Sequence, residues 1–135
     1  MSSSDIQSTF IEAAAAGTQT VSANASDVGN NAAMTLTASP YVTDQARKIT
    51  ITAANNQSGI SFTIVGLDET ATAATETLTG PTGGATVTST KYYSSVTSIT
   101  AVGNPQTAAG NISAGTGADI AAPIFRGDLR MRGMY

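Results

Sequence analysis

Few side chains in this sequence are of the types that do acid–base or nucleophilic chemistry. Its 135 residues include no histidine and no cysteine. The commonest general base, thiolate metal sites and disulfides are therefore all excluded, and so is a Ser-His-Asp triad. A serine–lysine dyad would have to use Lys48 or Lys91. A lysine beside a strand is more typically a solubilising residue.

The nine carboxylates are scattered along the chain. Asp68 and Glu69 are adjacent, so they point to opposite faces on a strand and are simply solvated in a turn. Asp27, Asn30 and Asn31 carry oxygen ligands that suit calcium, but their spacing matches no EF-hand loop, and local Asx turns explain them better. The sequence predicts no catalytic residue, no metal site and no cofactor.

Three further patterns have ordinary structural explanations. The glycine-rich residues 80–84 lack the Lys-Ser/Thr of a phosphate-binding loop and predict a hairpin turn. Residues 126–128 spell Arg-Gly-Asp, a tripeptide that arises readily by chance, and the chain starts without the pattern of a secretion signal. Of Tyr92 and Tyr93, one should pack inward and the other outward. A single exposed tyrosine could stack on a sugar, but a subunit contact suits it better.

The composition favours a structural protein over an enzyme. Charged residues make up 11% of the chain, against about 25% in ordinary soluble domains, and small and hydroxyl-bearing residues replace them. The net charge of −3 offers no basic face for nucleic acid. No apolar run is long enough to span a membrane. The length fits one domain.

From residue 18 the pattern is typical of β-strands, with apolar side chains at every second position. Residues 47–53 place Ile49 and Ile51 inward, and residues 60–66 do the same with Phe62 and Ile64. The short polar connection between these two segments predicts an antiparallel hairpin. Further strands are expected from Val21 and over residues 33–37, 75–79, 85–90, 96–102 and, more weakly, 111–113.

Seven or eight short strands separated by Gly, Asn and Pro turns predict an all-β fold. We expect an antiparallel β-sandwich over residues 18–114, of jelly-roll or immunoglobulin-like type, with extended arms at both termini.

The N-terminal arm covers residues 1–17. Asp5 is placed to cap a short helix over residues 7–16. The segment is either a frayed terminus or an arm that docks on a neighbouring subunit, in which case Phe10 and Ile11 are its anchors.

The C-terminal arm covers residues 115–135 and begins with an expected flexible joint at residues 115–118. Disordered tails are usually polar, whereas this one alternates arginine with large apolar side chains, a composition typical of interface cores. It either orders on a partner or folds back on its own domain. The expected partner-binding residues are Ile124, Phe125, Arg126, Leu129, Arg130, Met131, Arg132, Met134 and Tyr135.

The succession of segments 47–54, 58–66, 75–81 and 87–99, from Arg-Lys-Ile-Thr-Ile-Thr to Lys-Tyr-Tyr-Ser-Ser-Val-Thr-Ser-Ile, resembles small β-structured virion proteins of tailed bacteriophages. The resemblance is to the capsid decoration, or cement, type. It implies a protein made in the host cytoplasm that sits on the capsid surface, often as a homotrimer, and bridges subunits of the major capsid protein. No contact residue transfers with it, because the shared pattern is one of strands and turns.

The leading hypothesis is therefore a non-enzymatic capsid cement protein with no nucleic-acid, membrane or small-molecule partner. Two alternatives remain: another virion component, such as a head–tail connector, tail-tube or fibre protein, and a glycan-binding β-module.

Overall fold

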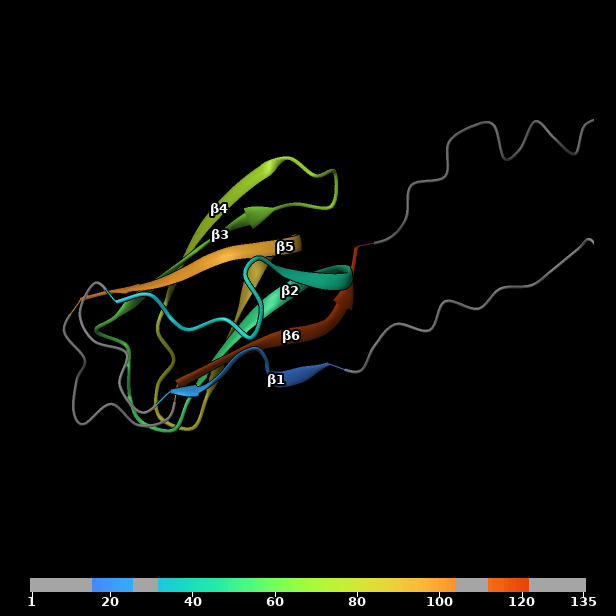
Figure 1. Cartoon of the computed structure of the whole chain (residues 1–135). Coiled ribbons are helices and arrows are strands. Elements are labelled where there is room, and N and C mark those ends of the chain that lie inside the picture. Colours follow the sequence, from blue (N-terminus) through green and yellow to red (C-terminus); the bar gives the residue numbers. More distant parts are fainter. Residues whose placement is uncertain (1–15, 26–31, 104–111, 122–135) are drawn as a thin grey trace, which may run out of the picture.

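A computed structural model of the chain describes residues 16–25, 32–103 and 112–121 (Figure 1). Their regular secondary structure is entirely β, and the paired strands are all antiparallel. The expected all-β antiparallel class is thus confirmed. Six strands form one sheet in the order β1-β6-β2-β5-β3-β4. The strands are β1 (Gly17–Ala25), β2 (Tyr41–Ala53), β3 (Ser61–Leu67), β4 (Ala73–Thr79), β5 (Thr86–Val102) and β6 (Ile112–Ile120).

The core is built from the alternating apolar positions of these strands. Ile49 and Ile51 on β2 are fully buried, as are Phe62 and Ile64 on β3, which confirms the inward positions expected from the sequence. β-Branched side chains at every second position suit such half-buried strands. The remaining buried apolar side chains are Val21, Met34, Ala53, Ile60, Ala74, Tyr93, Val96, Ile99, Ala101, Ile112 and Ala114.

The predicted hairpin between residues 47–53 and 60–66 is wrong. β2 pairs with β5 and β6, and β5 lies between β2 and β3. The connection from β2 to β3 instead packs on the connection from β4 to β5. The backbone N–H of Gln57 donates to Pro81 O at 2.8 Å, and the backbone N–H of Gly80 donates to Ile60 O at 2.7 Å. Residues 80–84 are therefore a turn, as expected, but they do not close a hairpin.

Strand β5 is one 17-residue element where two separate strands were expected. Its first half pairs with β2, and its second half pairs with β3 along the other edge. The two pairings overlap at Ser95 and Val96, each of which has a partner on both sides. Residues 91–95 stay in the strand because Tyr92, Tyr93 and Ser95 pair with β2.

Residues 33–37, expected to be a strand, form only an isolated bridge between Ala33 and Thr100. The segment nevertheless links both sides of the sheet. The Met34 amide donates to Ile99 O on β5 at 2.8 Å, and the Thr37 amide donates to Val21 O on β1 at 2.8 Å. Hydrogen bonds thus run in a closed circuit from β1 through β6, β2 and β5 back to β1, which encloses the core.

The expected flexible joint at residues 115–118 is wrong. Strand β6 continues through it to Ile120, and residues 112–116 are all buried. Burial at consecutive positions means that both faces of the strand are covered. At Gly115 the backbone of β1 comes so close that an added Cβ would lie 1.7 Å from Gly17 O, so only glycine fits there.

Candidate functional site

All eleven residues expected to bind partners lie outside the described residues, in segments 1–15 and 122–135. Their role stays a prediction. They are Phe10, Ile11, Ile124, Phe125, Arg126, Leu129, Arg130, Met131, Arg132, Met134 and Tyr135. The Asp27, Asn30 and Asn31 cluster also lies outside the described part of the chain.

The points from which these two segments continue lie at one end of the sheet (Figure 1). Gly17 at the start of β1 pairs with Thr116 on β6. The last described residue, Ala121, is held to β2 by its amide, which donates to Ala46 O at 2.9 Å. The fold therefore gives both predicted binding segments fixed starting points at the same end of the sheet.

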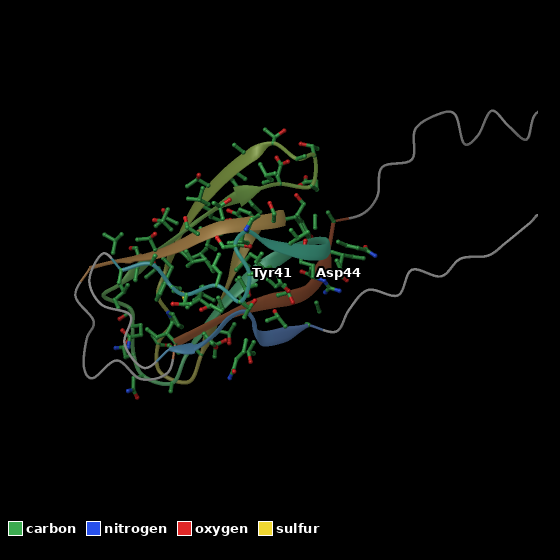
Figure 2. The ribbon with its side chains drawn as sticks, in the orientation of Figure 1. Tyr41 and Asp44 are labelled. Atoms are coloured by element: carbon green, nitrogen blue, oxygen red, sulfur yellow. The ribbon has the colours of Figure 1, made fainter. Side chains whose placement is uncertain are left out.

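A buried arginine reinforces this end of the sheet. The Arg47 side chain is 3% exposed, and its Nε donates to Asp44 Oδ1 at 2.7 Å. A second guanidinium nitrogen donates to Asp44 Oδ2 at 3.1 Å, and a third donates to Gly117 O at 2.9 Å. The hydrogen bond to Asp44 holds the pKa of Arg47 above its usual value. Figure 2 labels Asp44 at this end of the sheet. The bidentate pair with Asp44 fixes the orientation of the guanidinium group, and the bond to Gly117 O then ties β2 to β6 near the end of β6.

The adjacent carboxylates Asp68 and Glu69 do not form an acid–base pair. Asp68 Oδ1 accepts hydrogen bonds from the amide and hydroxyl of Thr70 at 2.8 and 2.7 Å, and from the Thr72 amide at 3.0 Å. These bonds, the Thr70 hydroxyl first, lower the pKa of Asp68. Asp68 thus organises the β3–β4 turn, beside an open hollow of about 280 Å³ that Glu69 and Lys91 also line.

Glu76 on β4 joins two parts of the sheet that are not neighbours. Its carboxylate accepts from the Thr90 amide at 2.8 Å, the Thr90 hydroxyl at 2.9 Å and the Lys91 amide at 3.0 Å. Partial burial alone would raise the pKa of Glu76. The hydrogen bonds from Thr90 and Lys91 have the larger combined effect, so the pKa lies below its usual value. Lys91 Nζ returns the contact by donating to Thr75 O at 2.7 Å. The group acts as a clamp between β4 and the first half of β5.

Both lysines that a serine–lysine dyad would need have other contacts. Lys91 belongs to the Glu76 clamp. Lys48 Nζ lies 3.6 Å from Asp119 Oδ2 and 5.3 Å from the centre of the Tyr92 ring. Tyr92 is partly exposed and Tyr93 is buried, which confirms that the two point to opposite sides. A subunit contact or a sugar contact through Tyr92 stays a prediction.

The buried hydroxyl of Tyr93 can be tested for its contribution to stability. Its hydroxyl is buried without a hydrogen-bond partner among the described residues, and burial, followed by the charge of Glu76, raises its pKa to about 12. Because an unpaired buried hydroxyl costs free energy, Tyr93→Phe should leave the free energy of unfolding unchanged or raise it by up to about 1 kcal/mol. Urea denaturation measures this.

Thr43→Val is the matched control. The buried Thr43 hydroxyl is 3.0 Å from the carbonyl oxygens of both Tyr93 and Ser94, so its loss should cost about 1 kcal/mol. A Tyr93→Phe protein that loses as much stability as Thr43→Val would show that the tyrosine hydroxyl has a partner.

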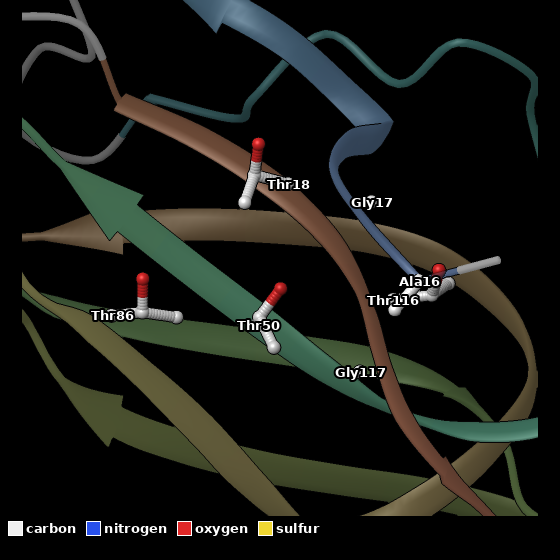
Figure 3. Close-up of a pocket in the computed structure, with 7 residues that line it drawn as sticks. All are labelled: Ala16, Gly17, Thr18, Thr50, Thr86, Thr116 and Gly117. Atoms are coloured by element: carbon white, nitrogen blue, oxygen red, sulfur yellow. The ribbon is translucent and has the colours of Figure 1, made fainter.

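A second hollow, of about 440 Å³, opens on the outer side of β1, β2, β5 and β6 (Figure 3). Its lining carries no ionisable side chain. Hydroxyl and methyl groups of threonine offer contact surface but no general acid or base. The lining residues are Ala16, Gly17, Thr18, Thr50, Thr86, Thr116 and Gly117.

Among the described residues, no cluster of three or more Asp and Glu side chains is placed to hold a metal ion, and no helix is long and apolar enough to cross a membrane. Comparisons of the chain with protein-family models, curated proteins and solved structures find no match.

Proposed function

We propose that this chain is a structural virion protein that decorates a bacteriophage capsid and cements it by bridging subunits of the major capsid protein. The observation that carries the proposal is the pairing of Gly17 with Thr116. It sets the start of β1 beside β6, so that the two segments with partner-binding composition leave the body at the same end of the sheet. A body with two neighbouring arms is suited to holding two adjacent subunits together.

Multivalency explains how such an arrangement stabilises a shell. Once one segment is bound, the other is held close to its own site, so the second contact forms at a high effective concentration. The C-terminal segment from residue 122 carries three arginines and one aspartate, which suits it to acidic groups on the shell. The function is structural rather than catalytic in this proposal.

The proposal includes a two-layered, sandwich-like body. Its support is the Glu76 clamp, which connects β4 to the first half of β5 although β3 and the second half of β5 lie between them in the sheet. A sheet whose distant parts are joined in this way presents a stiff platform for the arms.

Removing residues 122–135 should strongly weaken binding to capsid shells and leave the body folded. Strand β6 ends at Ile120, and the bond from Ala121 to Ala46 is retained, so the urea midpoint should not change. Co-sedimentation with purified shells should become at least about tenfold weaker, because the arm's anchors and multivalency are lost.

The matched control replaces Arg126, Arg130 and Arg132 with glutamine and keeps the apolar anchors. An intermediate loss of binding is expected because only the charged contacts disappear. A truncated chain that sediments with shells as well as the full chain would contradict the proposal. Binding to cell-surface glycans that survives truncation would favour the glycan-binding alternative instead.

A further inference from the structure

The outer sides of β3, β4 and the second half of β5 form a sheet surface without a charged side chain. Neighbours in register share a face, and Val65 on β3 pairs with Thr75 on β4 and Ser98 on β5. Neither β3 nor residues 95–102 contain any Asp, Glu, Lys or Arg. Glu76, the charged residue of β4, pairs with buried Ile64 and so points to the other face. We call this surface the uncharged face.

Three of the four large hydrophobic side chains that are exposed among the described residues lie on this face, and the fourth, Val42 on β2, lies beside it. Val65, Leu67 and Val102 are 37%, 38% and 46% exposed, and Val42 is 66% exposed. Register joins them, because Ser95 pairs with Leu67 on one side and with Val42 on the other. Single exposed hydrophobic residues are normal on a protein surface, but their concentration on one side marks an interaction surface.

Polar atoms on the uncharged face are partly satisfied already, which lowers the cost of covering it. The hydroxyls of Thr63 and Thr77, which pair across β3 and β4, lie 3.2 Å apart and hydrogen-bond to each other. Burying a hydroxyl that has a partner costs far less than burying one that has none. The face can therefore leave water without needing new hydrogen bonds at this pair.

The charge distribution identifies the occupant. The chain carries a net charge of −3, so two copies repel each other when they approach through charged surfaces such as the Asp68–Glu69 turn. A surface without charges meets itself at no Coulomb cost. We propose that the uncharged face docks against the same face of a second copy of this chain.

The size of the face sets the strength of this contact. Strand spacing and rise give roughly 330 Å² in plan for three segments of about seven residues. One partner in a standard interface contributes about 800 Å². Because the face is smaller than one side of a standard interface, the contact alone should be weak, and the fraction of associated chains should rise with concentration. The inference concerns copies in solution and stands independently of the capsid proposal.

Sedimentation equilibrium on the full chain over a range of concentrations tests the contact. The mass should rise with concentration above the 13.5 kDa of one chain. Val65→Lys and Val65→Glu should each raise the dissociation constant by at least about tenfold, because an unpaired charge would be buried. Mixing the two variants in equal amounts should restore association, because opposite charges then meet. Val102→Lys and Val102→Glu provide a second pair if a Val65 variant fails to fold.

Thr88→Lys is the control, because Thr88 is exposed on the first half of β5, away from the uncharged face. The Thr88→Lys protein should associate like the unchanged chain. Three results would overturn the inference: a single-chain mass throughout, Val65 variants that associate normally, or a mixture that fails to recover. The last result would mean that the face meets a different surface.

Discussion

Replacing Gly115 with alanine is expected to destabilise the fold by about 3 kcal/mol or more. A Cβ atom added there would lie 1.7 Å from Gly17 O, which is backbone and cannot rotate away. Strand β1 would have to separate from β6, and its hydrogen bonds to Thr116 would be strained. Because Thr116 is held by the Thr20 hydroxyl through its amide at 3.1 Å, the loss should spread along both strands. Urea denaturation gives the free energy of unfolding.

Gly117→Ala provides the comparison within the same strand. The nearest atom to a Cβ at this position is Lys48 O at 3.4 Å. Alanine restricts the unfolded chain more than glycine does, and where it fits it stabilises by about 0.4–1 kcal/mol. Gly117→Ala should therefore be neutral or slightly stabilising. Equal effects at the two positions would contradict the close approach of β1 to β6.

Replacing Glu76 with alanine is expected to cost about 2–3 kcal/mol, because the amides of Thr90 and Lys91 lose a charged acceptor. Glu76→Gln keeps one carbonyl oxygen as an acceptor and should lose less. Thermal or urea unfolding at neutral pH ranks the two variants. An alanine variant as stable as the unchanged protein would show that the clamp contributes nothing to the fold.

The same clamp predicts how stability changes with pH. The folded-state pKa of Glu76 lies below its ordinary value of 4.5, so the folded state favours the ionised carboxylate. Its contribution is complete above the unfolded-state pKa and is lost as the pH falls through the folded-state pKa. The stability gap between the unchanged chain and Glu76→Gln should therefore narrow below about pH 4.5. Asp68, whose pKa is also lowered, is present in both proteins and cancels in the comparison. A constant gap would contradict the proposed clamp.

The individual strands were more predictable from sequence than their pairing. Alternation at Ile49, Ile51, Phe62 and Ile64 identifies the buried face of two strands directly. It does not identify the partner, because the connection after Ala53 is short enough for a hairpin. What places β5 between β2 and β3 is a pair of connections, around residues 57 and 81, that bond to each other. Such a non-local contact leaves no mark on either segment alone.

Strand β6 and the uncharged face also depend on contacts between distant segments, which the sequence alone does not reveal. The segment from Gly115 to Gly117 has the small residues of a linker, and its pairing with β1 and β2 is what makes it part of a strand. The sequence shows that residues 61–67 and 95–102 lack charges, but not that they lie side by side. Gln57, in the polar connection between β2 and β3, is fully buried. The predicted partner-binding residues fall outside the described part of the chain, so the structure leaves their role as a prediction.

The capsid-cement proposal is tested most directly by the temperature at which purified shells of the major capsid protein break. Saturating amounts of the full chain should raise that temperature, because each bound copy ties adjacent subunits together, and the chain lacking residues 122–135 should leave it unchanged. A full chain that leaves the breaking temperature unchanged at saturation, or does not bind the shells at all, would contradict the proposal.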